Sequence, residues 1–230
     1  MLVTRPALRT SDDPATKARV LRAATELFAE RGFHGTKVRD IAERAGANVA
    51  AGHYHFGSKR DLYVEVLRQT FAEIRGVLAR GGVRPDPAAL DRMSRAELEA
   101  AFERRIGIVL ETLLGPPPSL HGALMQREML DPSDALPIVV EEFIEPMVAE
   151  TGEIIRRLAP GLDAERLRWC VMSVMGQAIF YRFTMPAALR VLRLQEFSPA
   201  YERRLAAHIA AFSTAGIARV ASARRTSRAR

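Results

Sequence analysis

Hydrogen-bond donors that suit phosphates and base edges are concentrated between residues 36 and 59. Arginine can donate two hydrogen bonds to guanine, and asparagine can pair with adenine. Phosphate oxygens accept hydrogen bonds from lysine, tyrosine and histidine, and from the free N–H groups at a helix N-terminus. Thr36 and Ser58 stand where helices are expected to begin beside these donors, which are Arg39, Asn48, His53, Tyr54, His55 and Lys59. This set of side chains is suited to binding a polyanion.

Catalytic chemistry has little support. The chain contains no Gly-rich phosphate loop, no G-x-S-x-G or H-E-x-x-H motif and no cysteine pair. Its one cysteine, Cys170, lies among apolar residues, where a structural thiol is favoured because reactive thiols need an electropositive setting. His53 and His55 are two positions apart, so on a helix they point to different sides and do not form a metal site. The other histidines are isolated: His34, His121 and His208. We expect no enzyme activity, no metal and no cofactor.

The positive charge lies at the two ends of the chain. The 230 residues include 34 Lys or Arg and 27 Asp or Glu, for a net charge of +7. Residues 1–82 hold 14 basic and nine acidic side chains, residues 83–218 hold 15 and 18, and residues 219–230 hold five and none. A basic segment beside a near-neutral body is typical of a polyanion-binding module attached to a body with another role. A solvated, arginine-rich surface is the alternative.

Composition favours a soluble globular protein of the cytoplasm. Hydrophobic residues make up 48% of the chain and charged residues 27%, as in ordinary globular domains. A single cysteine cannot form an internal disulfide, and no charged-then-apolar leader precedes Asp13. The uncharged apolar run at residues 169–181 is shorter than the roughly 20 residues that span a bilayer. We expect no membrane segment.

Apolar residues recur at helical spacing over nearly the whole chain, and no stretch alternates as a strand would, so we expect an all-α fold. Asp13 and Pro14 predict the start of the first helix, and Gly46 predicts the end of the second. Ser58 to Asp61 form a capping-box-like start for the fourth. Two short helices around Gly46 match the helix-turn-helix, whose second helix enters the DNA major groove. The expected helices are about 14–32, 37–45, 48–55, 61–75, 91–114, 119–130, 135–158, 163–183, 186–192 and 199–221.

Glycines and prolines divide the chain after residue 82. Gly81-Gly82 and the loop from Val83 to Pro87 interrupt the helical pattern. The last residues have no apolar face, so we expect them to be disordered. The expected parts are a helix-turn-helix DNA-binding domain at 14–60, a connecting helix at 61–82, a larger helical ligand-binding and dimerisation domain at 83–221 and a disordered basic tail at 222–230.

These motifs resemble those of the TetR family of bacterial regulators. The resemblance covers roughly residues 15–70 and rests on Ala18–Glu30 with Gly32-Phe33, Gly35–Ala42, Ala45-Gly46 and Tyr54–Lys59. It implies a homodimeric, all-α repressor whose C-terminal domain binds a small ligand and thereby releases DNA. The rest of the chain resembles the CerR-type subgroup through Asn48–Ala51, Arg127–Met129, Glu142–Met147 and Gly176–Tyr181.

The resemblance also implies roles for single residues of the helix-turn-helix. Tyr54, His55 and Lys59 would bind phosphates, with Thr36 at the start of the second helix. The residues that would face the groove are Arg39, Asn48, Val49, Ala50 and His53. Few of these side chains can read bases, so phosphate contacts and DNA shape would supply much of the recognition.

One position departs from the family pattern. The recognition helix usually carries Leu or Ile where this chain has Gly52. Glycine inside a helix costs about 1 kcal/mol relative to alanine, and the missing side chain also removes an anchor. We expect a mobile recognition helix in the free protein and a gain in stability from Gly52→Ile.

Methionines and aromatic residues are frequent in the middle helices. Flexible methionines and aromatic rings can line an adaptable pocket, and a few polar groups would orient a ligand. At helical spacing the same residues also suit an ordinary core. The candidate ligand-binding residues are Phe102, Arg105, Met125, Glu128, Met129, Phe143, Met147, Trp169, Met172, Gln177 and Tyr181.

Two long helices, residues 163–183 and 199–221, are the candidates for a homodimer interface. Two helices from each subunit make a four-helix contact, although ordinary packing within the chain is the alternative. A two-fold dimer would hold its recognition helices about 34 Å or a multiple apart. The DNA operator should then be an inverted repeat.

Two other functions fit parts of the sequence. A non-specific, nucleoid-type DNA-binding protein would use the same basic ends without an operator. An α-helical small-molecule-binding protein or enzyme would have no useful DNA specificity. The partners expected under the favoured hypothesis are double-stranded DNA, a small-molecule effector and a second copy of the chain.

Overall fold

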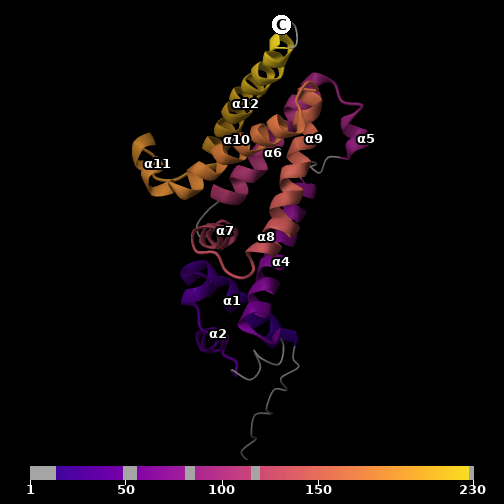
Figure 1. The fold of residues 1–230 in the computed structure, drawn as a ribbon. Helices are drawn as coiled ribbons and strands as arrows, with labels where there is room; N and C mark the ends of the chain where they lie inside the picture. Colours follow the sequence, from indigo (N-terminus) through magenta and orange to yellow (C-terminus); the bar gives the residue numbers. More distant parts are fainter. Residues whose placement is uncertain (1–13, 49–55, 81–85, 115–119, 228–230) are drawn as a thin grey trace, which may run out of the picture. The chain divides into compact units, whose positions relative to one another are not determined.

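The computed structural model describes residues 14–48, 56–80, 86–114 and 120–227 (Figure 1). Every regular element within these residues is helical, which confirms the expected all-α fold. A π-helical turn, η1 (Val140–Ile144), joins α8 to α9. The α-helices are α1 (Pro14–Gly35), α2 (Val38–Arg44), α4 (Lys59–Arg80), α5 (Pro87–Leu90), α6 (Arg95–Leu114), α7 (Leu120–Leu130), α8 (Leu136–Val139), α9 (Glu145–Leu158), α10 (Ala164–Phe183), α11 (Met185–Leu192) and α12 (Pro199–Ser227).

The chain packs as two compact units. The first comprises Met1–Thr70 and Ala123–Leu136, and the second comprises Phe71–Gly122 and Pro137–Arg230. The three divisions fall inside helices, α4, α7 and α8. The first unit therefore includes a segment that is far from the N-terminal helices in sequence. The domain limits expected from the sequence stay a prediction.

The first unit is built on the apolar face of α1. Val20, Leu21, Ala24, Leu27 and Phe28 recur at helical spacing, and none is more than 6% exposed. This stripe is what an amphipathic helix presents to a core. The apolar spacing in the N-terminal sequence therefore reflects the packing of α1 in the core of the first unit.

Two glycines in this unit adopt backbone angles that side chains disfavour. Gly32 has a φ of 72° and marks a kink within α1, where the sequence predicted the end of the helix. Gly46 has a φ of 57° after α2, and the N–H of Ala47 returns to the carbonyl oxygen of Ala42 over 2.9 Å. This left-handed glycine ends α2 as expected.

Ser58 and Asp61 form the predicted capping box at the start of α4. Ser58 Oγ accepts from the N–H of Asp61 at 3.1 Å, and Asp61 Oδ2 accepts from the N–H of Ser58 at 3.0 Å. The Ser58 hydroxyl also donates to Asp61 Oδ2 at 2.6 Å, and this bond, together with that from the Ser58 N–H, holds the pKa of the Asp61 carboxyl below its usual value. α4 then runs to Arg80, past the expected end near Arg75.

The core of the second unit lies between α6, α9, α10 and α12 (Figure 1). Phe102, Leu110, Ile155, Val171 and Ile209 are each at most 1% exposed. These residues come from all four helices, so the helical spacing predicted in the C-terminal half corresponds to one shared core.

Other helix boundaries differ from the expectation for local reasons. α6 begins at Arg95 and not near residue 91, because Ser94 Oγ and Glu97 Oε2, 2.7 Å apart, form a capping box there. The helix expected at 135–158 contains the turn η1 before Pro146, which has no N–H for the α-helical ladder. α12 continues to Ser227, so residues 222–227 are helical where disorder was expected. Alanine and arginine, which are frequent there, favour helix.

One described helix is long and apolar enough to cross a membrane by length and composition, which the sequence analysis did not foresee. Residues Pro199–Ser222 of α12 reach a mean hydropathy of 1.2, and 33% of the most apolar window is buried. Length and composition alone are weak support for a membrane span, because the core helix of a soluble protein passes the same test. Leu205, Ile209 and Ile217 of α12 do belong to the core of the second unit.

Candidate DNA-binding unit and ligand site

Arg39 is exposed on α2, in the described part of the helix-turn-helix. Two other arginines of this unit are held by carboxylates. Arg31 Nη1 lies 2.9 Å from Asp40 Oδ2, and Arg44 Nη1 lies 2.7 Å from Glu30 Oε1. The hydrogen bond from Arg44 lowers the pKa of the Glu30 carboxyl. The surface of α2 therefore presents the guanidinium of Arg39, while its neighbours are neutralised within the protein.

Thr36 has a structural position. It is 1% exposed, and its hydroxyl oxygen lies 2.8 Å from the carbonyl oxygen of Gly32 and 3.1 Å from that of Leu27. α2 begins at Val38, after Lys37. A buried hydroxyl that donates to the backbone does not reach a phosphate, so the predicted contact between the Thr36 side chain and DNA is not supported.

Lys59 is the first residue of α4 and is half-buried. Its Nζ lies 4.2 Å from the ring centroid of Phe33, which is a cation–π contact. Burial lowers the pKa of the Lys59 ammonium group. The aromatic ring therefore fixes this positive charge at the N-terminus of a long helix, where an anion is favoured.

Most of the recognition helix expected at 48–55 lies outside the described residues. Asn48, at its start, is exposed. Phe56, just after it, is half-buried, with Lys17 Nζ 5.6 Å from its ring centroid. The residues whose expected roles fall outside the described part are Val49, Ala50, Gly52, His53, Tyr54 and His55.

A buried carboxylate joins α4 to the 123–136 segment inside the first unit. Glu128 is 1% exposed, and its Oε2 accepts a 2.7 Å hydrogen bond from the Tyr63 hydroxyl. Its Oε1 accepts from the N–H and the hydroxyl of Ser133, each at 3.0 Å. Burial and the bond to Glu128 raise the pKa of the Tyr63 phenol above its usual range. Both carboxylate oxygens are occupied, so the prediction of Glu128 as a ligand-binding group is not supported.

Arg105 on α6 is a buried charge of the second unit, 1% exposed. Its Nε donates to Thr151 Oγ1 at 2.8 Å, and one Nη donates to the carbonyl oxygen of Met147 at 3.1 Å. The other Nη lies 3.0 Å from Glu150 Oε2. Burial lowers the pKa of the guanidinium, and Glu150 opposes that shift. Successive turns of α9 thus provide the acceptors that allow a charge in this core.

A small void lies beside Arg105. Its volume is about 10 Å³, and its lining from α6, α9 and α10 includes Phe102, Thr151, Val174 and Met175. That volume holds about one water molecule, so an organic ligand does not fit in this arrangement. Two of the predicted ligand residues, Phe102 and Arg105, meet here.

Three predicted ligand residues have other surroundings. Met125 and Met129 are half-buried and belong to the first unit. Phe143 belongs to the second, where its ring stacks on Phe71 with centroids 4.5 Å apart. None of them lines the void beside Arg105.

Gln177 and Tyr181 contact other elements of the second unit. Gln177 Nε2 donates to Ser213 Oγ at 3.0 Å and so links α10 to α12. The Tyr181 ring meets that of Phe197 edge-on, with centroids 6.0 Å apart. Both residues are therefore involved in packing.

Large apolar side chains are exposed on α10 and α12. Trp169 and Met172 on α10 are each 59% exposed, and Phe180 on the same helix is 57% exposed. On α12, Phe212 is 65% and Val220 is 39% exposed. The prediction that Trp169 and Met172 line a pocket is not supported. They belong to the outer surface of the two helices that were expected to form a dimer interface.

A helical unit with the described helix-turn-helix elements, followed by a larger all-α unit, is the architecture of a class of DNA-binding regulators. Residues 20–66 match the model of the bacterial regulatory proteins of the tetR family. Residues 94–217 match that of the C-terminal domain of the HTH-type transcriptional dual regulator CecR. The chain belongs to the TetR family of transcriptional regulators, with a CecR-type C-terminal domain. This C-terminal domain is that of the CerR-type subgroup that the C-terminal motifs predicted.

Individual relatives agree with this assignment. The dual regulator CecR of Shigella flexneri is 28% identical over 188 residues, which cover 78% of this chain and 81% of the relative. The repressor KstR2 of Rhodococcus jostii is 39% identical over 99 residues, 41% of this chain and 44% of the relative. The solved structure of Bacillus subtilis FadR with stearoyl-CoA has a TM-score of 0.63 at 16% identity, covering 87% of this chain and 98% of that one. The matched proteins are transcriptional regulators, not enzymes.

Proposed function

We propose that this TetR-family regulator is a cytoplasmic repressor that binds an inverted-repeat operator as a homodimer and is released by a small-molecule effector. The name of KstR2 describes a repressor, and that of CecR describes a dual regulator. Activation is therefore the alternative to repression. The sections of the chain that would carry these steps are the first unit, the outer faces of α10 and α12, and the region around Arg105.

Operator binding rests above all on the exposure of Arg39. This residue lies on α2, within the segment that matches the family's DNA-binding model. A guanidinium there can donate two hydrogen bonds to one guanine, worth about 1 to 3 kcal/mol of discrimination. Lys59 would add a phosphate contact, and Asn48 would face the groove. Roles at this DNA-binding surface are also proposed for Val49, Ala50, His53, Tyr54 and His55. They rest on the resemblance to the TetR family.

Homodimer formation is supported by the exposed apolar residues of α10 and α12. Trp169, Met172 and Phe180 recur at helical spacing on one helix, and Phe212 and Val220 on the other. Aromatic and methionine side chains are enriched at protein interfaces. Two such helices from each subunit would bury these side chains in a four-helix contact.

Effector binding is proposed at the void beside Arg105. The void is too small for an organic molecule, so binding requires that side chains of α9 or α10 move. Arg105 and Thr151, which line the void, would then exchange some of their present hydrogen bonds for bonds to the effector. Operator DNA should in turn weaken effector binding by the same factor, because coupling between two sites is reciprocal. α4, which contributes residues to both units, is the proposed connector.

A selection of binding sites from random duplex DNA tests the proposal. We expect enrichment of an inverted repeat whose half-sites are centred about 10 base pairs or a multiple apart. Arg39→Ala should abolish or alter the enriched sequence, whereas Arg190→Ala, an exposed arginine of α11, should not. Binding without an enriched motif would support the non-specific, nucleoid-type alternative. No binding at all would support an α-helical small-molecule-binding protein.

A further inference from the structure

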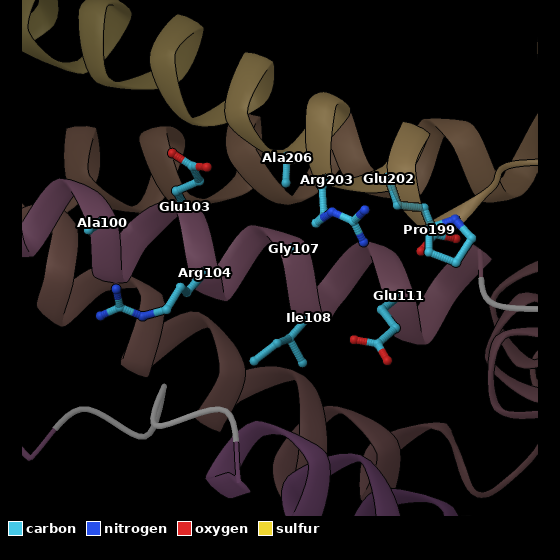
Figure 2. A pocket seen from close by; sticks show the side chains of 10 residues that line it. All are labelled: Ala100, Glu103, Arg104, Gly107, Ile108, Glu111, Pro199, Glu202, Arg203 and Ala206. Carbon is cyan, nitrogen blue, oxygen red and sulfur yellow. The ribbon is translucent and has the colours of Figure 1, made fainter.

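A groove of about 700 Å³ lies between α6 and the start of α12 in the second unit (Figure 2). Its volume is in the range of sites that hold small organic ligands. Gly107 and Ala206 form part of its floor, where the two helices approach closely. A Cβ atom on Gly107 would lie 3.7 Å from the Cβ of Ala206. The floor is apolar because Gly107 has no side chain and Ala206 has only a methyl group.

The groove is separate from the void beside Arg105. Phe102 and Arg105 face the void, whereas Gly107 and Glu111 line the groove. At 100° per residue these two pairs lie on opposite sides of α6. A ligand in the groove would therefore contact a face of α6 that the proposed effector does not use.

Glu202 is the residue of the groove best placed to bind a ligand through hydrogen bonds. It is 7% exposed, yet its carboxylate makes no hydrogen bond, and no ion pair within 4 Å, with a residue in the part of the chain that the structure describes. Its side chain extends from α12 towards α6 (Figure 2). Burial and the nearby Glu111 raise the pKa of the Glu202 carboxyl, and Arg203 opposes that shift. The oxygens of this carboxylate are not fully buried, so they can accept hydrogen bonds from a donor that enters the groove.

The charged and apolar residues of the groove indicate which chemical class of ligand would donate to Glu202. Three glutamates, Glu103, Glu111 and Glu202, and two arginines, Arg104 and Arg203, line the groove, so its net charge is −1 and favours a cation. An ammonium nitrogen has N–H donors for both Glu202 and Glu111, and charge-assisted hydrogen bonds of this kind are stronger than neutral ones. Ile108 and Ala206 give the ligand's remainder an apolar surface.

We propose that the groove between α6 and α12 binds an amphipathic organic ammonium ion, with its nitrogen at Glu202 and Glu111 and its apolar part along Ile108 and Ala206. This is a second ligand site, independent of the effector site proposed beside Arg105. It does not require that the protein bind an operator or release it.

Calorimetric titration of the full chain with hexylammonium tests this site, with hexanol and hexanoate as comparators of the same length. We expect saturable binding of hexylammonium and at least about tenfold weaker binding of the two comparators. Glu202→Gln, which keeps the shape and removes the charge, should weaken hexylammonium binding by about tenfold or more. Glu111→Gln should weaken it by less. Glu165→Gln, at an exposed glutamate in the first turn of α10, is the matched control and should bind as the wild type does.

Thermal unfolding of each variant separates loss of binding from loss of folding. Glu202→Gln removes a buried charge without a partner, so its melting temperature should equal or exceed that of the wild type. The proposal is overturned if hexylammonium shows no saturation up to about 10 mM. It is also overturned if hexanol binds equally well, or if folded Glu202→Gln binds hexylammonium with wild-type affinity.

Discussion

The hydroxyl of Tyr63 donates a 2.7 Å hydrogen bond to the carboxylate of Glu128, 65 positions later in the chain. Both residues are at most 1% exposed. The bond joins α4 to the segment that completes the first unit, and Ser133 occupies the second carboxylate oxygen. The unit that carries the helix-turn-helix is therefore held together by a buried polar network as well as by its apolar core.

Removing the Tyr63 hydroxyl should destabilise the protein. Tyr63→Phe leaves one oxygen of the buried Glu128 carboxylate without its donor, which costs about 1 to 3 kcal/mol. Urea unfolding followed by circular dichroism measures the loss. Tyr201→Phe is the matched control, because the hydroxyl of Tyr201 has no hydrogen bond to a described residue, and it should change stability by less than about 0.5 kcal/mol. Equal stability of Tyr63→Phe and the wild type would contradict the role of this bond.

The same phenol predicts how stability changes in alkali. The pKa of Tyr63 is raised in the folded protein, by burial first and by Glu128 second, whereas an unfolded tyrosine titrates near about pH 10. Above that pH the unfolded chain loses the proton and the folded protein keeps it, so stability falls as pH rises. Unfolding curves between neutral pH and about pH 11 should show a steeper decline for the wild type than for Tyr63→Phe. Parallel declines would show that Tyr63 does not contribute.

Arg105 should be needed for the stability of the second unit, whereas its neighbour Arg104 should not. Arg105→Met leaves Thr151 and the partly exposed Glu150 without their buried partner, which should cost about 1 to 3 kcal/mol. Arg104→Met, at an exposed position, should cost less than about 0.5 kcal/mol. Adding Glu150→Gln to Arg105→Met should restore part of the loss. A double variant less stable than Arg105→Met would contradict this account of the pair.

Local signals in the sequence predicted the parts of the fold that depend on neighbouring residues. Two examples are the capping box of Ser58 and Asp61 and the glycine, Gly46, that ends α2. Both act within a few residues, so the local sequence is enough to predict them. The turn η1 follows from Pro146, although its exact form needed the structure. Residue spacing therefore indicates where helices start and stop more reliably than how they join.

Contacts between distant residues escaped the sequence analysis. Nothing near Glu128 signals that Tyr63 is its partner, so an acidic residue among methionines resembled a pocket group. Trp169 and Met172 resembled pocket or core residues because an exposed apolar surface can hold the same residue types as a core. Arg105 was the informative case, since a charge on the apolar stripe of α6 requires a buried acceptor, and a search of the facing helices would have suggested Glu150.

A charge on the outer face of α12 should dissociate the proposed homodimer. Phe212 is 65% exposed in the single chain, and Phe212→Glu would bury an unpaired carboxylate if this face is an interface. Sedimentation at micromolar concentration should show a dimer for the wild type and a monomer for the variant. Val191→Glu alters a residue of α11 that is 81% exposed and should leave the dimer intact. A dimeric Phe212→Glu variant would direct the search to another surface.

The central claim, sequence-specific DNA binding by the first unit, is tested most directly by fluorescence anisotropy. The wild-type protein is titrated into the duplex enriched by selection and into a scrambled duplex of equal composition, from about 50 to 200 mM salt, where phosphate-driven binding weakens strongly. We predict a preference of about a thousandfold or more for the enriched duplex, the lower end for specific binders. Arg39→Ala should reduce this preference, while Arg190→Ala should retain it. Equal affinity of the wild type for both duplexes at every salt concentration would contradict the account.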